Sequence, residues 1–313
     1  MPSSAITLTD VSKSFGTKTA VDDLNLDIPE GTVYGFIGPN GSGKTTTIRM
    51  ILRILQPDRG RVVVLRTETG VTADDRVGYL PEERGLYKKM KVGDVIEFFA
   101  HLKGLHNCRS DIHHWLDRLG IAETAAKRVD SLSKGMSQKV QFIVAVISRP
   151  RLLVLDEPFS GLDPVNMEVL KDAILDLNRD GTTILFSTHD MQVAERMCDR
   201  VCMIFNGKKV LDGTLDEIQA RYGDDTLRLK VGESQVLSNL PGVSQVNDYG
   251  RYQELRLSQG TDPQGVLRLL LTRTSIDHFE KTRPSLHDIF VRIAGPGSGN
   301  GQPIGQAGGN SHA

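Results

Sequence analysis

One stretch of the chain combines glycines, a lysine and hydroxyl side chains in a spacing that suits phosphate binding. Its residues are Gly38, Pro39, Asn40, Gly41, Ser42, Gly43, Lys44, Thr45 and Thr46. It follows the apolar run VYGFI, opens the helical pattern TTTIRMIL, and contains G-x-x-x-x-G-K-[ST]. Glycines let backbone N–H groups turn toward phosphate oxygens, and the helix N-terminus adds its positive dipole end. We expect a nucleotide here, with Lys44 reaching the β- and γ-phosphates and the Thr45 hydroxyl binding Mg²⁺.

A second apolar run, LLVL at residues 152–155, is followed by two carboxylates, Asp156 and Glu157. A phosphate-binding loop of this kind needs an acidic anchor for its metal, usually at the end of another strand. Asp156 is placed to hold Mg²⁺ through water, and Glu157 to polarise an attacking water as general base. The pattern alone also fits a capped strand end, but together with the upstream loop it predicts hydrolysis of a nucleotide.

Three further segments complete a resemblance to the nucleotide-binding subunit of ATP-binding cassette (ABC) transporters, across essentially all of residues 6–220. LSKGM at residues 132–136 resembles the family's signature loop, SGLD at 160–163 its D-loop, and STH at 187–189 its switch strand ending in histidine. All five motifs occur in the family's order. The resemblance implies an α/β fold, a P-loop NTPase of the ABC type. It has a mixed sheet core, a helical subdomain and an antiparallel β subdomain, here followed by a small α+β C-terminal domain.

The resemblance also implies how two subunits share the chemistry. Ser133 and the backbone at Gly135 would open a helix whose N-terminus binds the γ-phosphate of a nucleotide held by a second subunit. Asp163 would link the two sites across the interface. The active unit would therefore be a dimer with two composite sites.

Within one subunit, the resemblance assigns the adenine contact to Phe15, which we expect before the first strand. His189 would hydrogen-bond the γ-phosphate and help position Glu157 and the attacking water. The catalytic residues implied are Glu157, His189 and Lys44.

The chain departs from the family's pattern at two positions. Lys134 stands where the signature commonly has a glycine, and Ser133 and Gly135 are kept, so we expect the γ-phosphate contact to be kept. Glu82 stands where most relatives have the glutamine of the Q-loop. A carboxylate can face Mg²⁺ or water but adds negative charge beside the γ-phosphate. We predict that Glu82 acts at the metal with Thr45 and Asp156; the sequence leaves open whether it instead turns outward.

The elements around these motifs alternate between β-rich runs and helical patterns, which indicates an α/β domain. Expected strands lie at residues 32–37, 61–65, 152–155 and 182–187, and expected helices at 44–55, 93–102, 112–119, 136–147, 165–177 and 191–197. Asn206-Gly207, between VCMIF and KKVL, predicts a two-residue hairpin.

After Thr214 the pattern changes to a short helix at residues 215–222, three alternating runs, and helical runs near 264–272 and 285–293. We predict an ABC ATPase domain at residues 1–222 with its helical subdomain at about 88–148, and an accessory α+β domain at 223–294. The tail at 295–313, rich in Gly, Asn and Gln, is expected to be disordered.

The composition excludes several other classes. The chain carries 38 Lys and Arg against 39 Asp and Glu, so we expect no nucleic-acid partner. Its three cysteines, Cys108, Cys198 and Cys202, fit neither a disulfide framework nor a zinc site. No secretory signal is evident, and apolar runs such as residues 142–147 fall far short of the ~18 residues that could span a bilayer.

PEERGLY at 81–87, LSKGM and the downstream PSLHDIF resemble bacterial export-type ABC ATPases, including those for sodium or drug extrusion. The resemblance implies a cytoplasmic ATPase that drives export of an unidentified substrate, using ATP and Mg²⁺. Its partners would be a second nucleotide-binding subunit and a separate membrane permease, which holds it at the inner face of the membrane. Exposed apolar side chains around Tyr87 are candidates for that contact.

The alternative is a soluble non-transport ABC ATPase acting in translation or DNA maintenance. Such proteins usually carry two cassettes or a long coiled-coil insertion, and neither is present in the sequence.

Overall fold

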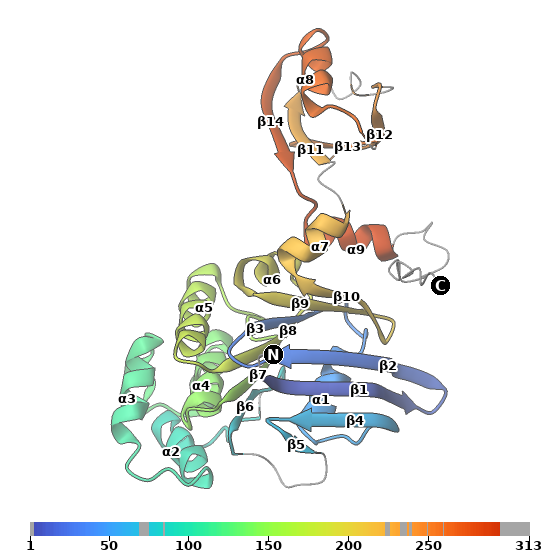
Figure 1. Cartoon of the computed structure of the whole chain (residues 1–313). Helices are drawn as coiled ribbons and strands as arrows, with labels where there is room; N and C mark the ends of the chain where they lie inside the picture. Colours follow the sequence, from blue (N-terminus) through green and yellow to red (C-terminus); the bar gives the residue numbers. More distant parts are fainter. Residues whose placement is uncertain are drawn as a thin grey trace. The chain divides into compact units, whose positions relative to one another are not determined.

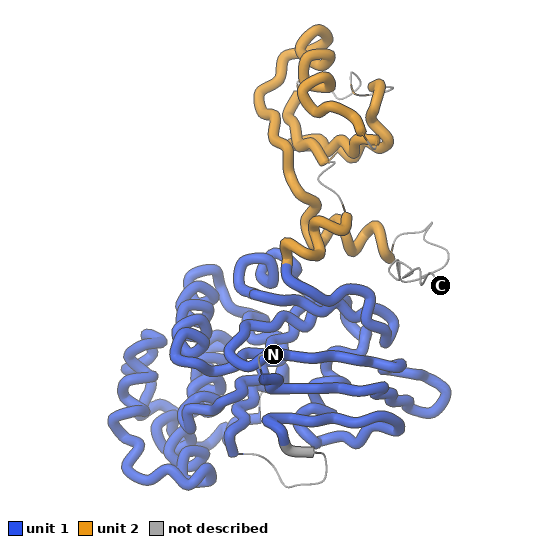
Figure 2. The backbone as a smooth tube through the Cα atoms, in the orientation of Figure 1, with its two compact units in different colours: residues 1–214 blue, residues 215–313 orange. Residues whose placement is uncertain are grey.

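Two units, residues 1–214 and 215–313, make up the structure, a computed structural model (Figure 2). It describes residues 3–68, 75–83, 85–222, 226–231, 237, 240–248, 250–258 and 260–294. The units divide after Thr214, whereas the sequence placed the domain boundary after Tyr222. Helix α7 (Leu215–Tyr222) therefore groups with the second unit. The predicted tail at 295–313 lies outside the described residues.

A six-stranded mixed sheet forms the centre of the first unit, in the order β10-β9-β3-β8-β7-β6 (Figure 1). Its strands are β3 (Val33–Ile37), β6 (Val77–Leu80), β7 (Leu152–Asp156), β8 (Thr183–Thr188), β9 (Arg200–Phe205) and β10 (Lys208–Thr214). The five strands from β9 to β6 in this order run parallel, and β10 pairs antiparallel with β9 through the predicted hairpin. Every residue of β3, β7 and β8 is buried, as expected for apolar strands covered on both faces.

A second, antiparallel sheet has the order β2-β1-β4-β5. Its strands are β1 (Ser4–Phe15), β2 (Lys18–Pro29), β4 (Arg59–Val64) and β5 (Thr67–Glu68). Strands β1 and β2 were not predicted from the sequence, because several register shifts interrupt their pairing and break the alternation of apolar and polar residues. The prediction that Phe15 precedes the first strand is wrong: it is the last residue of β1.

Helices cover the faces of the central sheet. They are α1 (Lys44–Ile51), α2 (Val92–Leu102), α3 (Arg109–Arg118), α4 (Lys134–Val146), α5 (Pro164–Arg179) and α6 (Met191–Met197), with 3₁₀ turns η1 (Ala122–Thr124) and η2 (Val129–Ser131). Ile48 and Met50 of α1 share a core with strands of both sheets, whereas α2, α3 and α4 pack around Phe142 and Ile143 in a second core. The predicted mixed core, helical subdomain and antiparallel β subdomain are confirmed.

The second unit contains an antiparallel sheet in the order β12-β13-β11-β14. Its elements after α7 are β11 (Thr226–Val231), β12 (Val243–Asp248), β13 (Gln253–Leu257), α8 (Pro263–Leu271), β14 (Ile276–Thr282) and α9 (Leu286–Ala294). Leu227, Leu255 and Leu270 belong to its core, which is separate from those of the first unit. Strand β14, IDHFEKT, was not predicted from the sequence, because four of its seven residues are charged or histidine and most are exposed.

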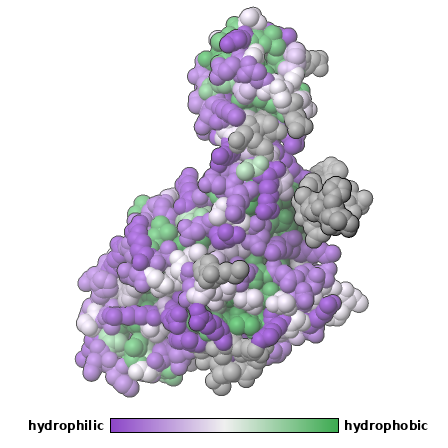
Figure 3. Space-filling model, in the orientation of Figure 1, coloured by the Kyte–Doolittle hydropathy of each residue, from purple (hydrophilic) through white to green (hydrophobic). Residues whose placement is uncertain are grey.

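The visible surface is mainly hydrophilic, with small hydrophobic areas between the charged side chains (Figure 3). Among the described residues, no helix combines the length and hydropathy that crossing a membrane requires.

Candidate functional site

The phosphate-binding loop, the Asp156–Glu157 pair and His189 lie at the ends of three adjacent parallel strands. The phosphate-binding loop follows β3, Asp156 ends β7 and is followed by Glu157, and His189 follows β8. Because β3 pairs with β8 and β8 with β7 in parallel, the carboxyl ends of the three strands lie at one edge of the sheet. This edge is where open α/β sheets bind their ligands.

The phosphate-binding loop depends on glycines for steric reasons. A Cβ atom at Gly38 would lie 2.2 Å from the carbonyl oxygen of Ile204, and one at Gly43 would lie 2.5 Å from that of Ala20. Gly43 also caps α1 with a φ of +113°, in the region that favours glycine. The loop thus packs backbone to backbone against β2 and β9, which leaves the N-terminus of α1 to face a phosphate.

Lys44 is held inside this loop. Its side chain is 6% exposed, and its Nζ donates hydrogen bonds to the carbonyl oxygens of Gly38 (2.7 Å) and Pro39 (3.2 Å). Burial lowers the pKa of the ammonium, and the negative charges of Glu157, Asp156 and Glu82 offset part of this shift. The backbone of the loop therefore holds the ammonium group at the N-terminus of α1.

One carboxylate oxygen of Asp156 accepts no hydrogen bond from the described residues. Asp156 is 1% exposed, and its Oδ1 accepts a hydrogen bond from the Ser187 hydroxyl. Its other oxygen, Oδ2, is buried and has no hydrogen-bond partner among the described residues. A buried carboxylate oxygen without a partner is costly, and a cation or its bound water would satisfy it. This orphaned oxygen fits the predicted magnesium ligand.

Glu157 is positioned by its backbone and by His189. Its φ is +49°, an uncommon value for a residue other than glycine, and its N–H approaches the Ser187 carbonyl and hydroxyl oxygens at 3.2 Å each. Oε1 of Glu157 lies 2.9 Å from His189 Nδ1 and 4.0 Å from Lys44 Nζ. The side chain is thus aimed at the phosphate-binding loop, with 10% of its surface exposed.

A cavity of about 400 Å³ opens beside this loop. Its lining residues are Phe15, Lys18, Ala20, Asn40, Gly41, Gly43, Lys44, Thr45, Thr46, Glu82 and Glu157. Phe15 is 53% exposed, and Nζ of Lys13 lies over its ring at 5.8 Å from the centroid, so an exposed part of the ring remains for stacking on a flat ligand. The cavity brings together Phe15, the loop and both carboxylates Glu82 and Glu157, which are far apart in the sequence.

The remaining predicted residues of the loop and of the metal and base group lie next to the cavity rather than in its lining. Gly38, Ser42 and Asp156 are buried, Pro39 is half-buried, and His189 contacts Glu157 from an exposed position. Lys18 and Ala20 line the cavity, and Ser187 contacts both Asp156 and Glu157; the sequence analysis gave none of the three a role. Ser187 lies two residues before the switch histidine, and its place near the end of the buried strand β8 was the available signal.

The predicted signature and D-loop residues do not line this cavity. Ser133 caps α4 by accepting a hydrogen bond from Met136 N at 3.2 Å, and Asp163 caps α5 by accepting one from Asn166 N at 3.0 Å. Hydrogen bonds from Asn166 lower the pKa of Asp163. Ser133 and Asp163 are accessible for contact with a second molecule.

These two loops pack against each other within the chain. A Cβ atom at Gly135 would lie 3.3 Å from Cδ2 of Leu162, and one at Gly161 would lie 2.5 Å from Cε of Lys134. The Lys134 side chain thus rests on Gly161 of the D-loop. Lys134, the residue that departs from the signature pattern, is therefore accommodated against the D-loop, and Ser133 and Gly135 remain at the start of α4.

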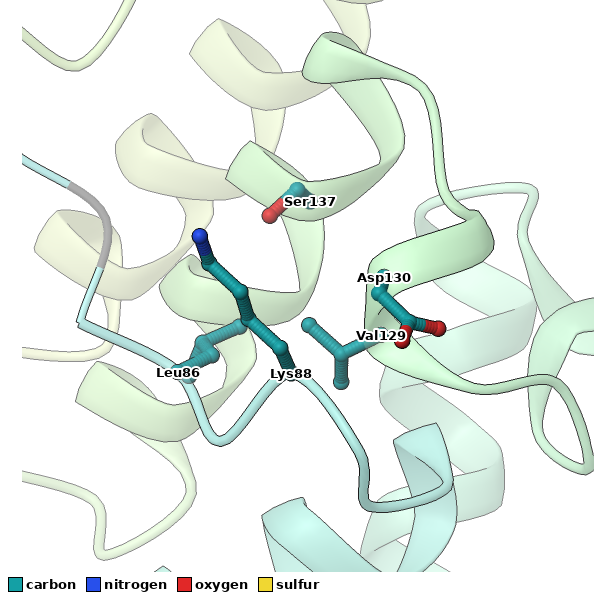
Figure 4. A pocket seen from close by; sticks show the side chains of 5 residues that line it. All are labelled: Leu86, Lys88, Val129, Asp130 and Ser137. Atoms are coloured by element: carbon teal, nitrogen blue, oxygen red, sulfur yellow. The ribbon is translucent and has the colours of Figure 1, made fainter.

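A second cavity, of about 240 Å³, lies between the segment after Glu82 and α4 (Figure 4). Its lining residues are Leu86, Lys88, Val129, Asp130 and Ser137. Figure 4 shows Lys88 and Ser137 on opposing elements, and Val129 and Asp130 at one side of the cavity.

Within the described parts of the chain, no three His, Cys, Asp or Glu side chains gather to hold a metal ion by themselves. Mg²⁺ is usually bound by one or two carboxylates together with water and substrate phosphates, so a site built from Asp156, Thr45 and a nucleotide needs no such cluster.

Comparison with known proteins identifies both units. Residues 21–160 match the ABC transporter family, and residues 213–294 match the C-terminal domain described as ATP-binding protein DrrA1-3-like. The chain is 41% identical over 293 residues to the uncharacterized ABC transporter ATP-binding protein YhaQ of Bacillus subtilis, covering 93% of this chain and 98% of that protein. It is 33% identical over 299 residues to the Nod factor export ATP-binding protein I of Sinorhizobium fredii, covering 93% and 86%.

A similar solved structure is a dimeric ATP-binding cassette in a post-hydrolysis state, bound to ADP and Pi. It is 25% identical, with a TM-score of 0.62, and the match covers 67% of this chain and 98% of that chain. Together with the phosphate-binding loop and the Glu157–His189 pair, these matches show that the chain belongs to the ABC transporter family, as an ATP-binding and ATP-hydrolysing subunit.

Proposed function

We propose that this chain hydrolyses ATP as one half of a dimer and drives export through a separate membrane permease. The Glu157 carboxylate carries the proposal, because its Oε1 lies 4.0 Å from Nζ of the phosphate-binding Lys44 and 2.9 Å from Nδ1 of His189. A base in that position faces the place where the γ-phosphate of a nucleotide in the loop would lie.

In this proposal each residue has one task. The loop backbone and Lys44 hold the phosphates, and the exposed ring of Phe15 stacks on the adenine at the other end of the cavity. Glu157 accepts the proton of the attacking water at a carboxylate oxygen. His189 orients that carboxylate and reaches the γ-phosphate. Catalysis is mainly positioning and charge stabilisation, as is general for phosphoryl transfer.

Asp156, Thr45 and Glu82 would hold Mg²⁺. The orphaned Oδ2 of Asp156 supports this, as does the presence of Thr45 and Glu82 in the lining of one cavity. Bound with ATP, the ion would neutralise charge on the β- and γ-phosphates. The oxygen-only donor set matches the preference of Mg²⁺.

A second copy, or a related subunit, would complete the site. Ser133 and Gly135 lie outside the lining of the chain's own cavity, at the N-terminus of a 13-residue helix. That position suits an anion supplied by another molecule. Asp163 would contact the partner subunit across the same interface. The dimeric cassette with ADP and Pi supports this arrangement by similarity.

The permease contact would use the exposed aromatic group of the helical subdomain. Tyr87 is 54% exposed, and its ring packs against Phe98 and Phe99 at centroid distances of 5.5 and 6.1 Å. Exposed aromatic side chains of this kind are typical anchors of protein interfaces. The chain would thereby be held at the cytoplasmic face of the membrane. The similarity to a Nod factor export protein supports export as the direction of transport.

Co-purification tests this proposal directly. The chain is expressed with the membrane protein encoded next to it, extracted in detergent, and assayed for ATP hydrolysis. We expect a stable complex, hydrolysis that depends on Mg²⁺, and loss of the complex in Tyr87→Asp but not in Val165→Asp, which lies at another exposed apolar position. Full ATPase activity with no membrane partner would favour the soluble alternative.

A further inference from the structure

Two buried glutamines on α4 each hold a backbone carbonyl next to one of the two carboxylates that line the cavity. Gln138 is 2% exposed, and its Nε2 donates to the Pro158 carbonyl at 3.1 Å, one residue after Glu157. Gln141 is 4% exposed, and its Nε2 donates to the Glu83 carbonyl at 3.2 Å, one residue after Glu82. The two glutamines are three positions apart and so lie on one face of the helix.

Fold stability does not explain Gln141. Its Oε1 is buried and has no hydrogen-bond partner among the described residues, although its neighbours Val140 and Phe142 are fully buried in the core. A buried amide oxygen without a partner destabilises a fold relative to an apolar side chain of the same size. Among the described residues, the amide side chain donates its hydrogen bond to the Glu83 carbonyl, a contact that an apolar residue could not supply.

The segment that follows Glu83 shares a hydrophobic core with α4 through Leu86, which is 9% exposed. The cavity lined by Lys88 and Ser137 separates the two elements where they next face each other (Figure 4). Further along, the segment pairs with the residues before the signature loop, through Asp130 N to Lys88 O (2.9 Å) and Val129 N to Met90 O (3.0 Å). Among the hydrogen bonds of the described residues, the one from Gln141 to the Glu83 carbonyl links α4 to this segment closest to Glu82.

We propose that Gln141 is a positioning residue, which sets Glu82 relative to the signature helix through the Glu83 carbonyl. This inference rests on the proposed role of Glu82 at the metal. Ser133 caps the same helix. When Ser133 binds the partner's nucleotide, the position of Gln141 on this helix changes or becomes fixed, and the hydrogen bond from Gln141 changes or fixes the position of Glu82 in turn. One helix then connects the metal end of one composite site with the phosphate contact of the other.

The test uses Gln141→Met, which keeps the length of the side chain and removes both the donor and the unpartnered oxygen. Gln138→Met is the matched control. It removes the same kind of hydrogen bond from the same helix, in this case to the Pro158 carbonyl in the segment that follows Glu157. Both are combined with Glu82→Ala. Mn²⁺ binding is measured by the loss of the free-ion EPR signal in the presence of a non-hydrolysable ATP analogue, and ATP hydrolysis is measured alongside. Fluorescence of the single tryptophan, Trp115, whose ring packs edge-on against Phe142 on α4, checks that the core is intact.

We expect Gln141→Met to weaken Mn²⁺ binding roughly tenfold, as loss of a group that orients a metal ligand does. It should add nothing in the Glu82→Ala background, because the two changes act through the same carboxylate. Gln138→Met should lower the rate of hydrolysis, leave Mn²⁺ binding unchanged, and add its effect to that of Glu82→Ala.

Two results would contradict the inference, and they differ in whether the proposed role of Glu82 fails as well. If Glu82→Ala binds Mn²⁺ and hydrolyses ATP like the wild type, Glu82 has no role at the metal, and the proposed role and the inference both fail. If Glu82→Ala weakens binding but Gln141→Met does not, or the two effects add, then only the positioning role of Gln141 is overturned.

Discussion

The Nδ1 atom of His189 lies 2.9 Å from Oε1 of Glu157, so the two residues form one hydrogen-bonded pair beside the phosphate-binding loop. Residues 157 and 189 follow different strands, β7 and β8, and are joined because these strands are neighbours in the sheet. The pair matches the requirement for a base held by an orienting group.

Glu157→Gln keeps the shape of the side chain but cannot accept a proton. Hydrolysis should fall by at least about 10²-fold, whereas ATP affinity should change little because the loop and Lys44 are untouched. ATP should then persist and hold two subunits together. We expect a dimer with Mg-ATP and a monomer without nucleotide, measured by light scattering alongside phosphate release.

Wild-type hydrolysis by this variant would eliminate Glu157 as the base. A stably monomeric form that retains bound ATP would count against the composite site. If the second unit already pairs the subunits, the nucleotide-free sample will be dimeric, and a variant of Ser133 then decides the question.

Lys44→Ala should weaken ATP binding strongly and abolish hydrolysis, because the cation held at the Gly38 and Pro39 carbonyls is lost. Lys18→Ala is the matched control, since Lys18 lines the same cavity but is exposed. Its effect on affinity should be small. Binding is measured with a fluorescent ATP analogue, and similar affinities for the two variants would contradict the assignment of the loop.

Glu82→Gln should retain hydrolysis, because the amide carbonyl oxygen can still face the metal or water, whereas Glu82→Ala should lose much of it. The two rates are compared at several Mg²⁺ concentrations in the presence of the cognate permease. Equal, wild-type rates in both variants would show that Glu82 lies in the cavity lining without a function there.

Lys134→Gly should retain ATP-dependent pairing in a Glu157→Gln background, because Ser133 and Gly135 supply the proposed phosphate contact. Ser133→Ala should impair pairing, and should also lose the cap of α4, a loss that typically costs about 1 kcal/mol. Dimer formation is followed by light scattering over an ATP titration. If Lys134→Gly impaired dimer formation and Ser133→Ala did not, the γ-phosphate contact would have to be assigned to Lys134 instead of Ser133.

Gly35→Ala should destabilise the first unit by about 1–3 kcal/mol, because the new Cβ atom would lie 2.5 Å from Cys198 Sγ in a packed core. Cys198→Ala, combined with it, should restore part of the loss. Gly93→Ala in α2 is the control: its Cβ would meet only the Ala125 carbonyl at 3.4 Å, and alanine favours the helix. Urea unfolding measures all of these variants, and an unchanged midpoint for Gly35→Ala would contradict the packing argument.

The sequence by itself determined the parts of the site that are local. The phosphate-binding loop needs only a strand, its glycines and a helix start in succession, and Asp156 and Glu157 need only the end of a buried strand. Both signals are contiguous, so the central strands and the residues that follow them could be predicted from short segments. The second unit was likewise recognisable from a change of pattern near Thr214.

Only the tertiary structure decided how distant residues meet there. The family resemblance assigned Phe15 and Glu82 to the site, but not the contacts that bring them to it. Phe15 reaches the cavity from the end of β1, a strand whose register shifts hide its periodicity, and Glu82 reaches it from the segment after β6. Ser187 bonds Asp156, and Gln141 bonds the Glu83 carbonyl, because strand order and helix packing bring them together. No local pattern encodes such contacts, since each joins residues at least 31 positions apart whose proximity follows from the folded sheet.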